Sequence, residues 1–330
     1  MMRVAAYSAK GSAKDVLKII DVDDIPPGDG EIRVALHRSG INPSDVKMRA
    51  GLSLGGMEMP YPEVIPHSDG AGVIDAIGKG VSGFSVGDRV YVFNGGFKRQ
   101  FGTAADMITL PASQVLPLPD DTSFAHGACL GIPVMTAVHV MTRAPKIEGK
   151  TVLISSGGGV VGRYCIEVAR AMGAAKIITT ASSPLSIETA KRAGADAVVD
   201  YKDPKLTEAI MDMSGGIDHA VEAEFGVNAA MLGQVMNISG SIAAYGSALS
   251  KTPEIPFYDF MFKNTVVHMV LVYLLDDATR RHHAAMIHDL LVGGHITENI
   301  AASLPLESIS EAHEMVEDAR KSGSVLLEIR

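Results

Sequence analysis

A glycine-rich turn directly after a short apolar strand carries the clearest chemical signal in the chain. The strand-like run 151–155 is followed by Ser-Gly-Gly-Gly-Val-Val-Gly, in which Gly157, Gly159 and Gly162 have the G-x-G-x-x-G spacing. Apolar residues recur on one helical face from there to Met172, which predicts a helix after the turn. Glycines let a pyrophosphate approach the backbone, and the start of a helix offers free N–H groups and a positive dipole end. The segment therefore predicts a dinucleotide-binding turn.

The end of the next predicted strand bears on the choice of dinucleotide. In NAD-preferring sites an acidic residue about 20 residues after the glycine motif binds the ribose hydroxyls. No carboxylate occurs between Ile177 and Ile187, where Thr180, Ser182 and Ser183 stand instead. Because nothing there would repel a 2′-phosphate, the sequence favours NADPH over NADH.

Two rhythms of secondary structure divide the chain. In the first third, short apolar strands alternate with Gly and Pro, which is typical of a β-rich domain with antiparallel pairing. From residue 151, strands alternate with helices, which is the pattern of a doubly wound parallel sheet, so the fold class is α/β. The expected strands are 31–36, 70–75 and 88–93, then 151–155, 176–180, 197–199, 217–223 and 241–245.

The last part of the chain sets the domain boundaries. A helix over 278–292, an amphipathic segment over 306–321 and a strand over 325–329 have no obvious β-α partner nearby. We expect all three to return to the first domain and make it discontinuous; a simple division into two lobes after residue 272 is the alternative. The expected domains are 1–124 with 273–330, and 125–272.

Bulk composition limits the function classes. The 330 residues exceed what one hydrophobic core usually organises, and the net charge of −9 without a basic stripe argues against nucleic acid as a partner. The longest apolar run, 266–275, is roughly half of the ~20 residues that span a membrane, so it predicts a buried strand. Charge interrupts the first residues too early for an export signal, and only Cys129 and Cys165 occur, so we expect a cytoplasmic protein.

Motifs along essentially the whole chain are shared with one known family. They include Ser39-Gly-Ile-Asn-Pro-Ser-Asp45, Pro66-His-Ser-Asp-Gly-Ala-Gly72, Val86-Gly-Asp-Arg-Val90 and Gly131-Ile-Pro-Val-Met-Thr-Ala137. The chain thereby resembles the zinc-independent quinone oxidoreductases, the ζ-crystallin-like branch of the medium-chain dehydrogenase/reductase superfamily. The resemblance implies a GroES-like β-rich catalytic domain from both chain ends, a Rossmann domain with a doubly wound parallel sheet, and a cleft where nicotinamide meets substrate. It also implies a homodimer through the Rossmann sheet edge, with 266–273 as the edge strand.

The positions of the metal ligands differ from those of zinc-dependent relatives. Those relatives place a Cys where this chain has Asn42 and a His where it has Ser68, and their structural zinc lobe needs four closely spaced cysteines. The sequence therefore predicts no zinc. His67 is expected to be a loop residue. The cluster His282, His283 and His288 is expected to be a partly solvated helix face, with metal binding as the alternative.

The resemblance also assigns site residues. Asn42 would lie at the nicotinamide ribose and substrate, and Thr136 against the nicotinamide, while Asp45 is expected to hold the loop after Asn42. The pyrophosphate would follow Gly157, Gly158, Gly159, Val160, Val161 and Gly162. Thr180 ends the second strand, Ser182, Ser183 and Tyr201 would surround the 2′-phosphate, and Tyr245, Leu271 and Val272 would flank the nicotinamide half. Family members commonly carry lysines where this chain has Ser186 and Ser324.

These expectations define one leading function and two rivals. Without zinc no Lewis acid polarises an alcohol or carbonyl, so NADPH-dependent hydride transfer to a quinone-like acceptor is the leading hypothesis. An NADPH-dependent alkenal or enone reductase is the closest rival and needs a proton donor, for which Lys47 or Tyr245 could serve. The rival of another class is a non-catalytic, NADPH- or RNA-binding crystallin-like protein.

Overall fold

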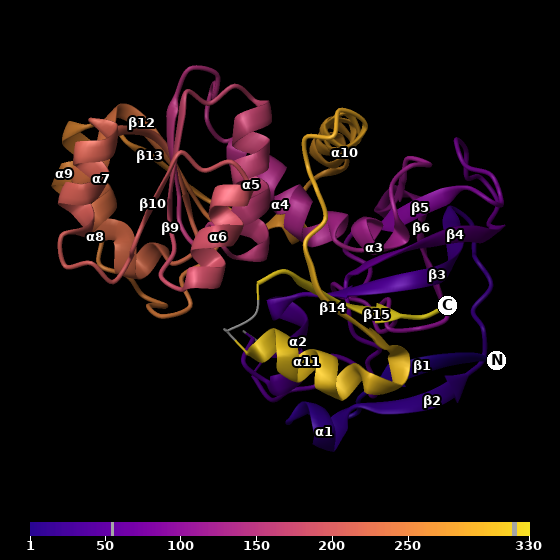
Figure 1. The fold of residues 1–330 in the computed structure, drawn as a ribbon. Coiled ribbons are helices and arrows are strands. Elements are labelled where there is room, and N and C mark those ends of the chain that lie inside the picture. The colour runs from indigo at the N-terminus through magenta and orange to yellow at the C-terminus, as the bar shows by residue number, and fades with distance from the viewer. Residues whose placement is uncertain (54–55, 319–321) are drawn as a thin grey trace. The chain divides into compact units, whose positions relative to one another are not determined.

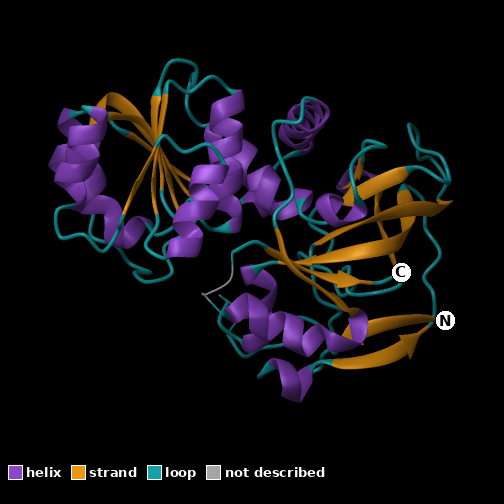
Figure 2. Ribbon diagram, viewed as in Figure 1, coloured by secondary structure: helices purple, strands orange, loops and turns teal. Residues whose placement is uncertain are grey.

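A computed structural model describes residues 1–53, 56–318 and 322–330 and divides the chain into two compact units (Figures 1 and 2). The first unit comprises Met1–Ile132 and Thr297–Arg330, and the second comprises Pro133–Ile296. The expected domain boundaries lie after residues 124 and 272, whereas the observed boundaries lie after residues 132 and 296.

The second unit is built on a six-stranded sheet in which every neighbouring pair is parallel. Chain order reverses between β8 and β11, which is the topological switch point where such sheets bind ligands. The predicted α/β class with a doubly wound sheet is confirmed. In spatial order the strands are β10 (Ala197–Val199), β9 (Lys176–Thr180), β8 (Thr151–Ile154), β11 (Ile217–Glu222), β12 (Met236–Ala244) and β13 (Val266–Met269).

Helices cover both faces of this sheet, which explains why its central strands are almost continuously apolar. Buried residues such as Leu153, Ile178 and Ala220 come from the strands, and Leu232 comes from a covering helix. One face carries α4 (Met135–Met141), α5 (Val160–Ala171) and α6 (Pro184–Arg192), and the other carries α7 (Leu206–Ser214), α8 (Phe225–Val235) and α9 (Phe257–Phe262) (Figure 1).

Helix α10 (Asp277–Val292) corrects the expectation that residues 278–292 return to the first domain. It belongs to the second unit, where it packs on α4. Its buried residues Arg280, His283, Ile287 and Leu290 recur at helical spacing, and the His283 ring is hydrogen-bonded to His139 of α4 at 3.0 Å. The amphipathic pattern therefore predicted the helix but not the surface that it covers.

Strand β13 corrects the expectation that residues 266–275 form a buried strand. The strand ends at Met269 and lies at the sheet edge, where among the described residues it pairs only with β12. Val266 is 49% exposed and Met269 is 67% exposed. The following residues form a 3-10 turn at Val272–Leu274.

The first unit is a mostly antiparallel β structure. Its larger sheet has the order β14-β15-β3-β4-β5-β7, with β6 paired to β3, and β1 pairs with β2 in a small second sheet. The strands are β1 (Met2–Ala6), β2 (Lys18–Val22), β3 (Glu31–Ile41), β4 (Asp69–Ile77), β5 (Arg89–Val92), β6 (Met107–Pro111), β7 (Val115–Pro117), β14 (Ile300–Pro305) and β15 (Ser324–Glu328). The helices are α1 (Ala13–Val16), α2 (Pro43–Ala50), α3 (Phe124–Gly127) and α11 (Ile309–Glu317).

The two chain segments of the first unit share one core and are linked by polar contacts. Val4, Leu36, Ala312 and Leu327 all belong to the same buried cluster. The predicted segment 306–321 contains α11, and its residues 319–321 lie outside the described part of the chain.

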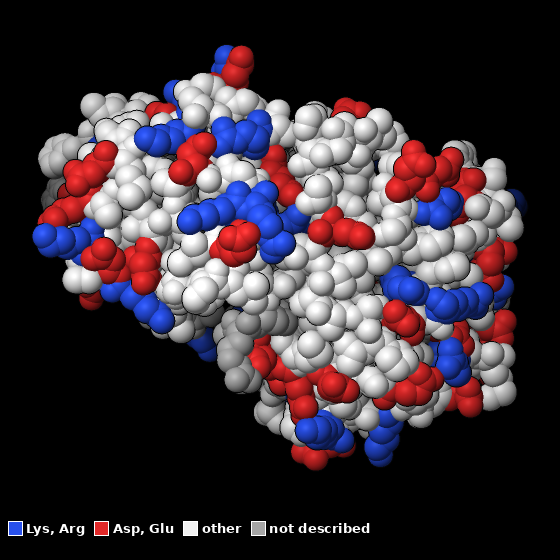
Figure 3. All heavy atoms as spheres, in the orientation of Figure 1, with Lys and Arg blue, Asp and Glu red and all other residues white. Residues whose placement is uncertain are grey.

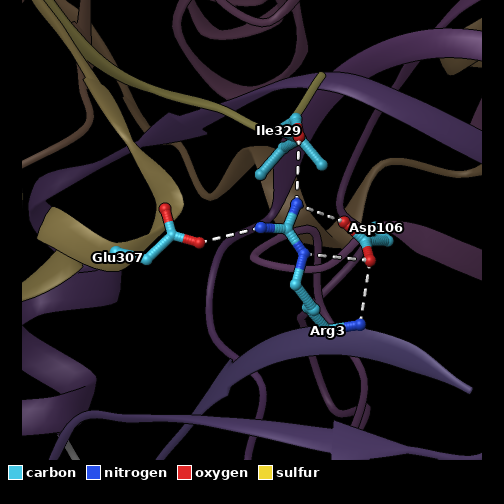
Figure 4. Close-up of polar contacts among 4 residues, drawn as sticks. All are labelled: Arg3, Asp106, Glu307 and Ile329. Atoms are coloured by element: carbon cyan, nitrogen blue, oxygen red, sulfur yellow. Dashed lines mark hydrogen bonds and ion pairs between the residues drawn. The ribbon is translucent and has the colours of Figure 1, made fainter.

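Arg3 is a polar link between these segments (Figure 4). Its guanidinium donates to Asp106 at 3.1 Å, to Glu307 at 2.8 Å and to the Ile329 carbonyl at 3.4 Å. The two ion pairs, with Asp106 and Glu307, add little to stability, because exposed ion pairs contribute about 0–1 kcal/mol each.

Candidate active site

The glycine turn of the second unit is tied to the end of β9. The N–H groups of Ser156 and Gly157 donate to the side-chain and main-chain oxygens of Thr180, each at 3.1 Å. Ser156 takes a left-handed φ of 57°, and Gly159 is the N-cap of α5. Thr180 thus braces the turn from the neighbouring strand.

The glycines of the turn differ in the space around them. A Cβ on Gly157 would lie 2.0 Å from Thr179 Oγ1, and one on Gly162 would lie 2.2 Å from the Ser156 carbonyl oxygen. A Cβ on Gly158 would lie 2.3–2.5 Å from atoms of Ser186. At Gly159 the nearest contact would be 3.2 Å, again to the Ser156 oxygen. Three glycines are therefore required by packing, whereas Gly159 at the start of the helix is exposed and open to a ligand.

The residues predicted for the 2′-phosphate lie after two adjacent strands, β9 and β10. Ser183 is the exposed N-cap of α6 and accepts a hydrogen bond from the Ser186 N–H at 3.1 Å, while Ser182 is half-buried. Tyr201 is 52% exposed after β10. Sequence reasoning missed Lys202, whose Nζ lies 5.8 Å from the centre of the Tyr201 ring. Lys202 could have been found from the sequence, because it lies just after a predicted strand and next to Tyr201.

Tyr245, Leu271 and Val272 follow the ends of β12 and β13. Tyr245 is half-buried, and its N–H donates to the Glu222 carbonyl at 3.0 Å. Burial, with added repulsion from Cys165 and Glu222, holds the pKa of its phenol well above the ordinary value, so the phenol stays protonated. Leu271 is 52% exposed, whereas Val272 is buried.

Glu222 is a second residue that sequence reasoning missed. It ends β11 at the switch point and is buried, with Oε1 accepting from the Glu224 N–H at 2.6 Å and from Asn228 Nδ2 at 2.9 Å. Burial raises the pKa of its carboxyl. Ser155 Oγ accepts from the Ala223 N–H at 2.7 Å, which joins the end of β8 to the end of β11.

Thr136 and Asn42 belong to different units. Thr136 lies in α4 of the second unit and is buried. Asn42 is the buried N-cap of α2 in the first unit and forms a capping box with Asp45, whose Oδ2 accepts from the Asn42 N–H at 2.8 Å. Burial raises the pKa of the Asp45 carboxyl to about 7, against the lowering effect of that N–H. Asp45 thus holds the start of α2.

Asp69 is the third residue that sequence reasoning missed. It is buried at the start of β4, where its Oδ2 accepts from Asn42 Nδ2 at 2.7 Å and its Oδ1 from the Ile132 N–H at 2.8 Å. No spacing in the sequence joins Asp69 to Asn42, so only the fold brings them together.

The histidines and cysteines do not group as metal ligands. Among the described residues, no three or more His, Cys, Asp or Glu side chains form a cluster that could hold a metal ion. His67 lies in a loop as expected and is buried, with ring hydrogen bonds to Ser39 and His313. In the cluster expected to be a partly solvated helix face, His282 and His288 are exposed, whereas His283 is only 2% exposed.

Two surface properties bear on partners. On the face shown in Figure 3, acidic and basic side chains are interspersed. Within the described residues, no helix is both long and apolar enough to cross a membrane.

Comparisons with known proteins match both parts of the chain. The family described as alcohol dehydrogenase GroES-like domain matches residues 28–120, and the family described as zinc-binding dehydrogenase matches residues 160–287. Quinone oxidoreductase of Rattus norvegicus is 29% identical over 321 residues, which covers 95% of this chain and 94% of that protein.

Solved structures are similar over nearly the full length. A structure described as an NAD-dependent alcohol dehydrogenase superposes with a TM-score of 0.86 at 26% identity and covers 99% of both chains. The native structure of a mycobacterial quinone oxidoreductase gives a TM-score of 0.86 at 25% identity, covering 99% of this chain and 100% of that one.

Proposed function

The chain belongs to the medium-chain dehydrogenase/reductase superfamily, in its quinone oxidoreductase branch, and from this premise we propose that it is an NADPH-dependent quinone oxidoreductase that transfers hydride without zinc. That the chain is an oxidoreductase follows from its family. The cofactor, the acceptor and the absence of zinc are the proposal.

The observation that carries the proposal is the absence of a carboxylate in the residues that follow β9, beside the glycine turn. Those residues offer hydroxyls at Ser182 and Ser183, and the residues after β10 offer Tyr201 and the ammonium of Lys202, between Asp200 and Asp203. A 2′-phosphate needs donors and positive charge, whereas a carboxylate at this place would repel it. The open Gly159 at the start of α5 fits the pyrophosphate in the same unit.

The residues at the zinc-ligand positions support chemistry without metal. Zinc is bound in proteins by Cys, His and carboxylate side chains, and the two positions here are Asn42 and Ser68. The amide nitrogen of Asn42 is already engaged by Asp69. An amide and a hydroxyl in these two places make a poor zinc site.

A quinone is the acceptor that such a site serves best. The bound dinucleotide would supply a hydride, and a quinone spreads the incoming charge over its ring, so that hydrogen bonds alone can satisfy the resulting oxyanion. The chain's own contribution is to bind and orient: Asn42 and Thr136 would hold the nicotinamide half, with Tyr245, Leu271 and Val272 flanking it. Orientation of this kind can supply much of the rate enhancement.

The first test is turnover of a small 1,4-benzoquinone with NADPH or NADH, with a metal chelator present throughout. We expect chelator-resistant oxidation with kcat/KM about ten-fold higher for NADPH, because the 2′-phosphate adds charge-assisted hydrogen bonds. Ser183→Asp should lower the NADPH preference without unfolding α6, since Asp is also a good N-cap. Ser82→Asp, an exposed site in the first unit, is the charge-matched control.

Three results would contradict the proposal. Loss of activity with the chelator would show that the reaction needs a metal. Equal use of NADH would contradict the preference for NADPH inferred from the absence of a carboxylate after β9. Turnover of 2-alkenals but not of quinones would favour the enone reductase, for which Lys47 and the phenol of Tyr245 are the candidate proton donors.

We also propose that the protein forms a homodimer through β13. An exposed strand edge with apolar side chains is a template for pairing, and α9 adds Phe257, Tyr258 and Phe262, which are 65–77% exposed. Val266→Lys with Met269→Lys should convert the dimer to a monomer at micromolar concentration, as measured by light scattering. Val86→Lys, at an exposed apolar residue of the first unit, should leave the mass unchanged. A wild-type monomer would refute this assembly.

A further inference from the structure

Asp69 is a buried carboxyl whose two oxygens are both occupied by N–H donors. It is 1% exposed, and its partners are Asn42 Nδ2 at 2.7 Å and the Ile132 N–H at 2.8 Å. Among the described residues it has no ion pair with a Lys, Arg or His. A buried carboxylate without a counter-ion is costly, because desolvation is not repaid by a salt bridge.

The surroundings of Asp69 add to the free-energy cost of burying its carboxylate. Burial holds the pKa of Asp69 well above the ordinary value, and the nearby Asp45 adds repulsion. An apolar residue of similar size would avoid both penalties. Ionisable groups that burial perturbs in this way cluster at functional sites.

The contacts of Asp69 show what it orients. Both Asp69 oxygens accept N–H bonds, an arrangement that fits the ionised carboxylate in spite of its raised pKa, and the Asn42 amide turns its NH2 group toward Asp69 and its Oδ1 away from it. The Asn42 N–H is held separately by Asp45 at 2.8 Å. Both ends of Asn42 are therefore fixed by buried acids.

The main chain of Asp69 is fixed as well. Its carbonyl accepts from Thr103 Oγ1 at 2.6 Å, and Thr103 is bonded at 2.8 Å to Ser39, which contacts the His67 ring at 2.9 Å. A Cβ on Gly131 would lie 2.1 Å from Asp69 Oδ1, so the chain before Ile132 passes directly over the carboxylate.

We propose that Asp69 is a positioning residue of the hydride-transfer site, whose carboxylate sets the orientation of the Asn42 amide and anchors the Leu130–Val134 turn that precedes Thr136 in the chain. The proposal rests on the proposed function, in which Asn42 and Thr136 contact the nicotinamide half. A carboxamide cannot replace Asp69, because it offers one acceptor where two donors must be satisfied.

The test is a substitution cycle on Asp69 and Asn42. Asp69→Asn should lower kcat/KM for NADPH about ten-fold, since losing one buried hydrogen bond and misorienting its donor has an effect of that size. In an Asn42→Ala background the same change should have little further effect. The exchange Asn42→Asp with Asp69→Asn restores one acceptor for each donor and should be more active than Asn42→Asp alone, in which two acceptors face each other. The matched control is Asp75→Asn. Asp75 lies on β4, as Asp69 does, and forms a partly exposed ion pair with Arg33 of β3.

Three outcomes would overturn the proposal. The first is an Asp69→Asn variant that keeps more than half of the wild-type kcat/KM, and the second is an equal loss in the Asn42→Ala background. The third is an exchange variant that is no more active than Asn42→Asp alone. If Asp69→Asn does not fold, the test compares the exchange variant with Asn42→Asp alone, in which two acceptors face each other. Equal activity of these two variants would refute the pairing of Asn42 with Asp69.

A second readout separates this proposal from the proposed function. NADPH binding, followed by the fluorescence of the reduced nicotinamide, does not depend on any acceptor. If the wild type binds NADPH but reduces neither quinones nor enals, the proposed function fails. Asp69 is then judged on the dissociation constant for NADPH, which should rise about ten-fold in Asp69→Asn and be lower in the exchange variant than in Asn42→Asp alone. An unchanged constant would refute the role of Asp69.

Discussion

Replacement of Gly162 by Ala is expected to destabilise the second unit and to abolish NADPH binding. The added Cβ would lie 2.2 Å from the Ser156 carbonyl oxygen and 3.0 Å from Gly157 Cα, both of which are backbone atoms that cannot rotate away. Overpacking of this kind costs about 1–3 kcal/mol, and here the shift would displace the turn itself. Urea unfolding and the NADPH-induced rise in Tm measure the two effects.

Gly159→Ala in the same turn is the matched control. Its Cβ would have one neighbour, at 3.2 Å, and the residue has a φ of −80°, which Ala adopts readily. We expect near-native stability but weaker NADPH binding, because the methyl group would stand at the N–H groups that we propose bind the pyrophosphate. A Gly162→Ala variant with wild-type melting would refute the packing argument, and undiminished NADPH affinity of Gly159→Ala would place the phosphates elsewhere.

These two glycines also show how far the sequence could predict the site. The motif spacing predicts a strand, a turn and a helix, and those elements are observed at 151–154 and 160–171. It does not say which glycine serves packing and which faces a ligand. That distinction depends on contacts made only in the folded protein: the Ser156 carbonyl oxygen would lie 2.2 Å from a Cβ on Gly162 but 3.2 Å from one on Gly159, and Thr179 and Ser186 similarly crowd Gly157 and Gly158.

Other differences between the predictions from sequence and the structure also arise from contacts that form only in the folded protein. An apolar run such as 266–275 does not report whether a strand is central or at an edge, because both need β-branched residues on a pleated surface. The helical pattern of 278–292 gives the apolar stripe of α10 but not its partner α4. The contact between Asp69 and Asn42 spans 27 residues and depends on where β4 begins. Local patterns thus predicted the elements, and long-range contacts decided their partners.

Between pH 7.5 and 5 the buried pair His67 and His313 is expected to lower the stability of the first unit, while the buried carboxyls Asp45 and Asp69, whose pKa values are raised, act in the opposite direction. The two Nε2 atoms are 2.8 Å apart, so one ring donates and the other accepts, and both rings are neutral. Burial lowers the pKa of His313 to about 3 and holds that of His67 well below the ordinary value. Unfolded histidines take up protons near pH 6.5, so below that pH the unfolded state binds more protons and the free energy of unfolding falls.

The size of the effect follows from the same linkage. Each histidine that stays neutral when folded contributes a loss of about 1.4 kcal/mol per pH unit below 6.5, or about 2 kcal/mol by pH 5. Urea unfolding at pH 7.5 and 5 measures it. His313→Gln keeps a polar partner for His67 and removes one titrating ring, so its loss between the two pH values should be smaller by about that amount. His219, which is also buried but fully hydrogen-bonded, remains as a common background in both proteins. If wild type and His313→Gln lost the same free energy of unfolding, the pair would have to take up a proton in the folded state. The contact between α11 and the loop before β4 would then persist with a buried charge.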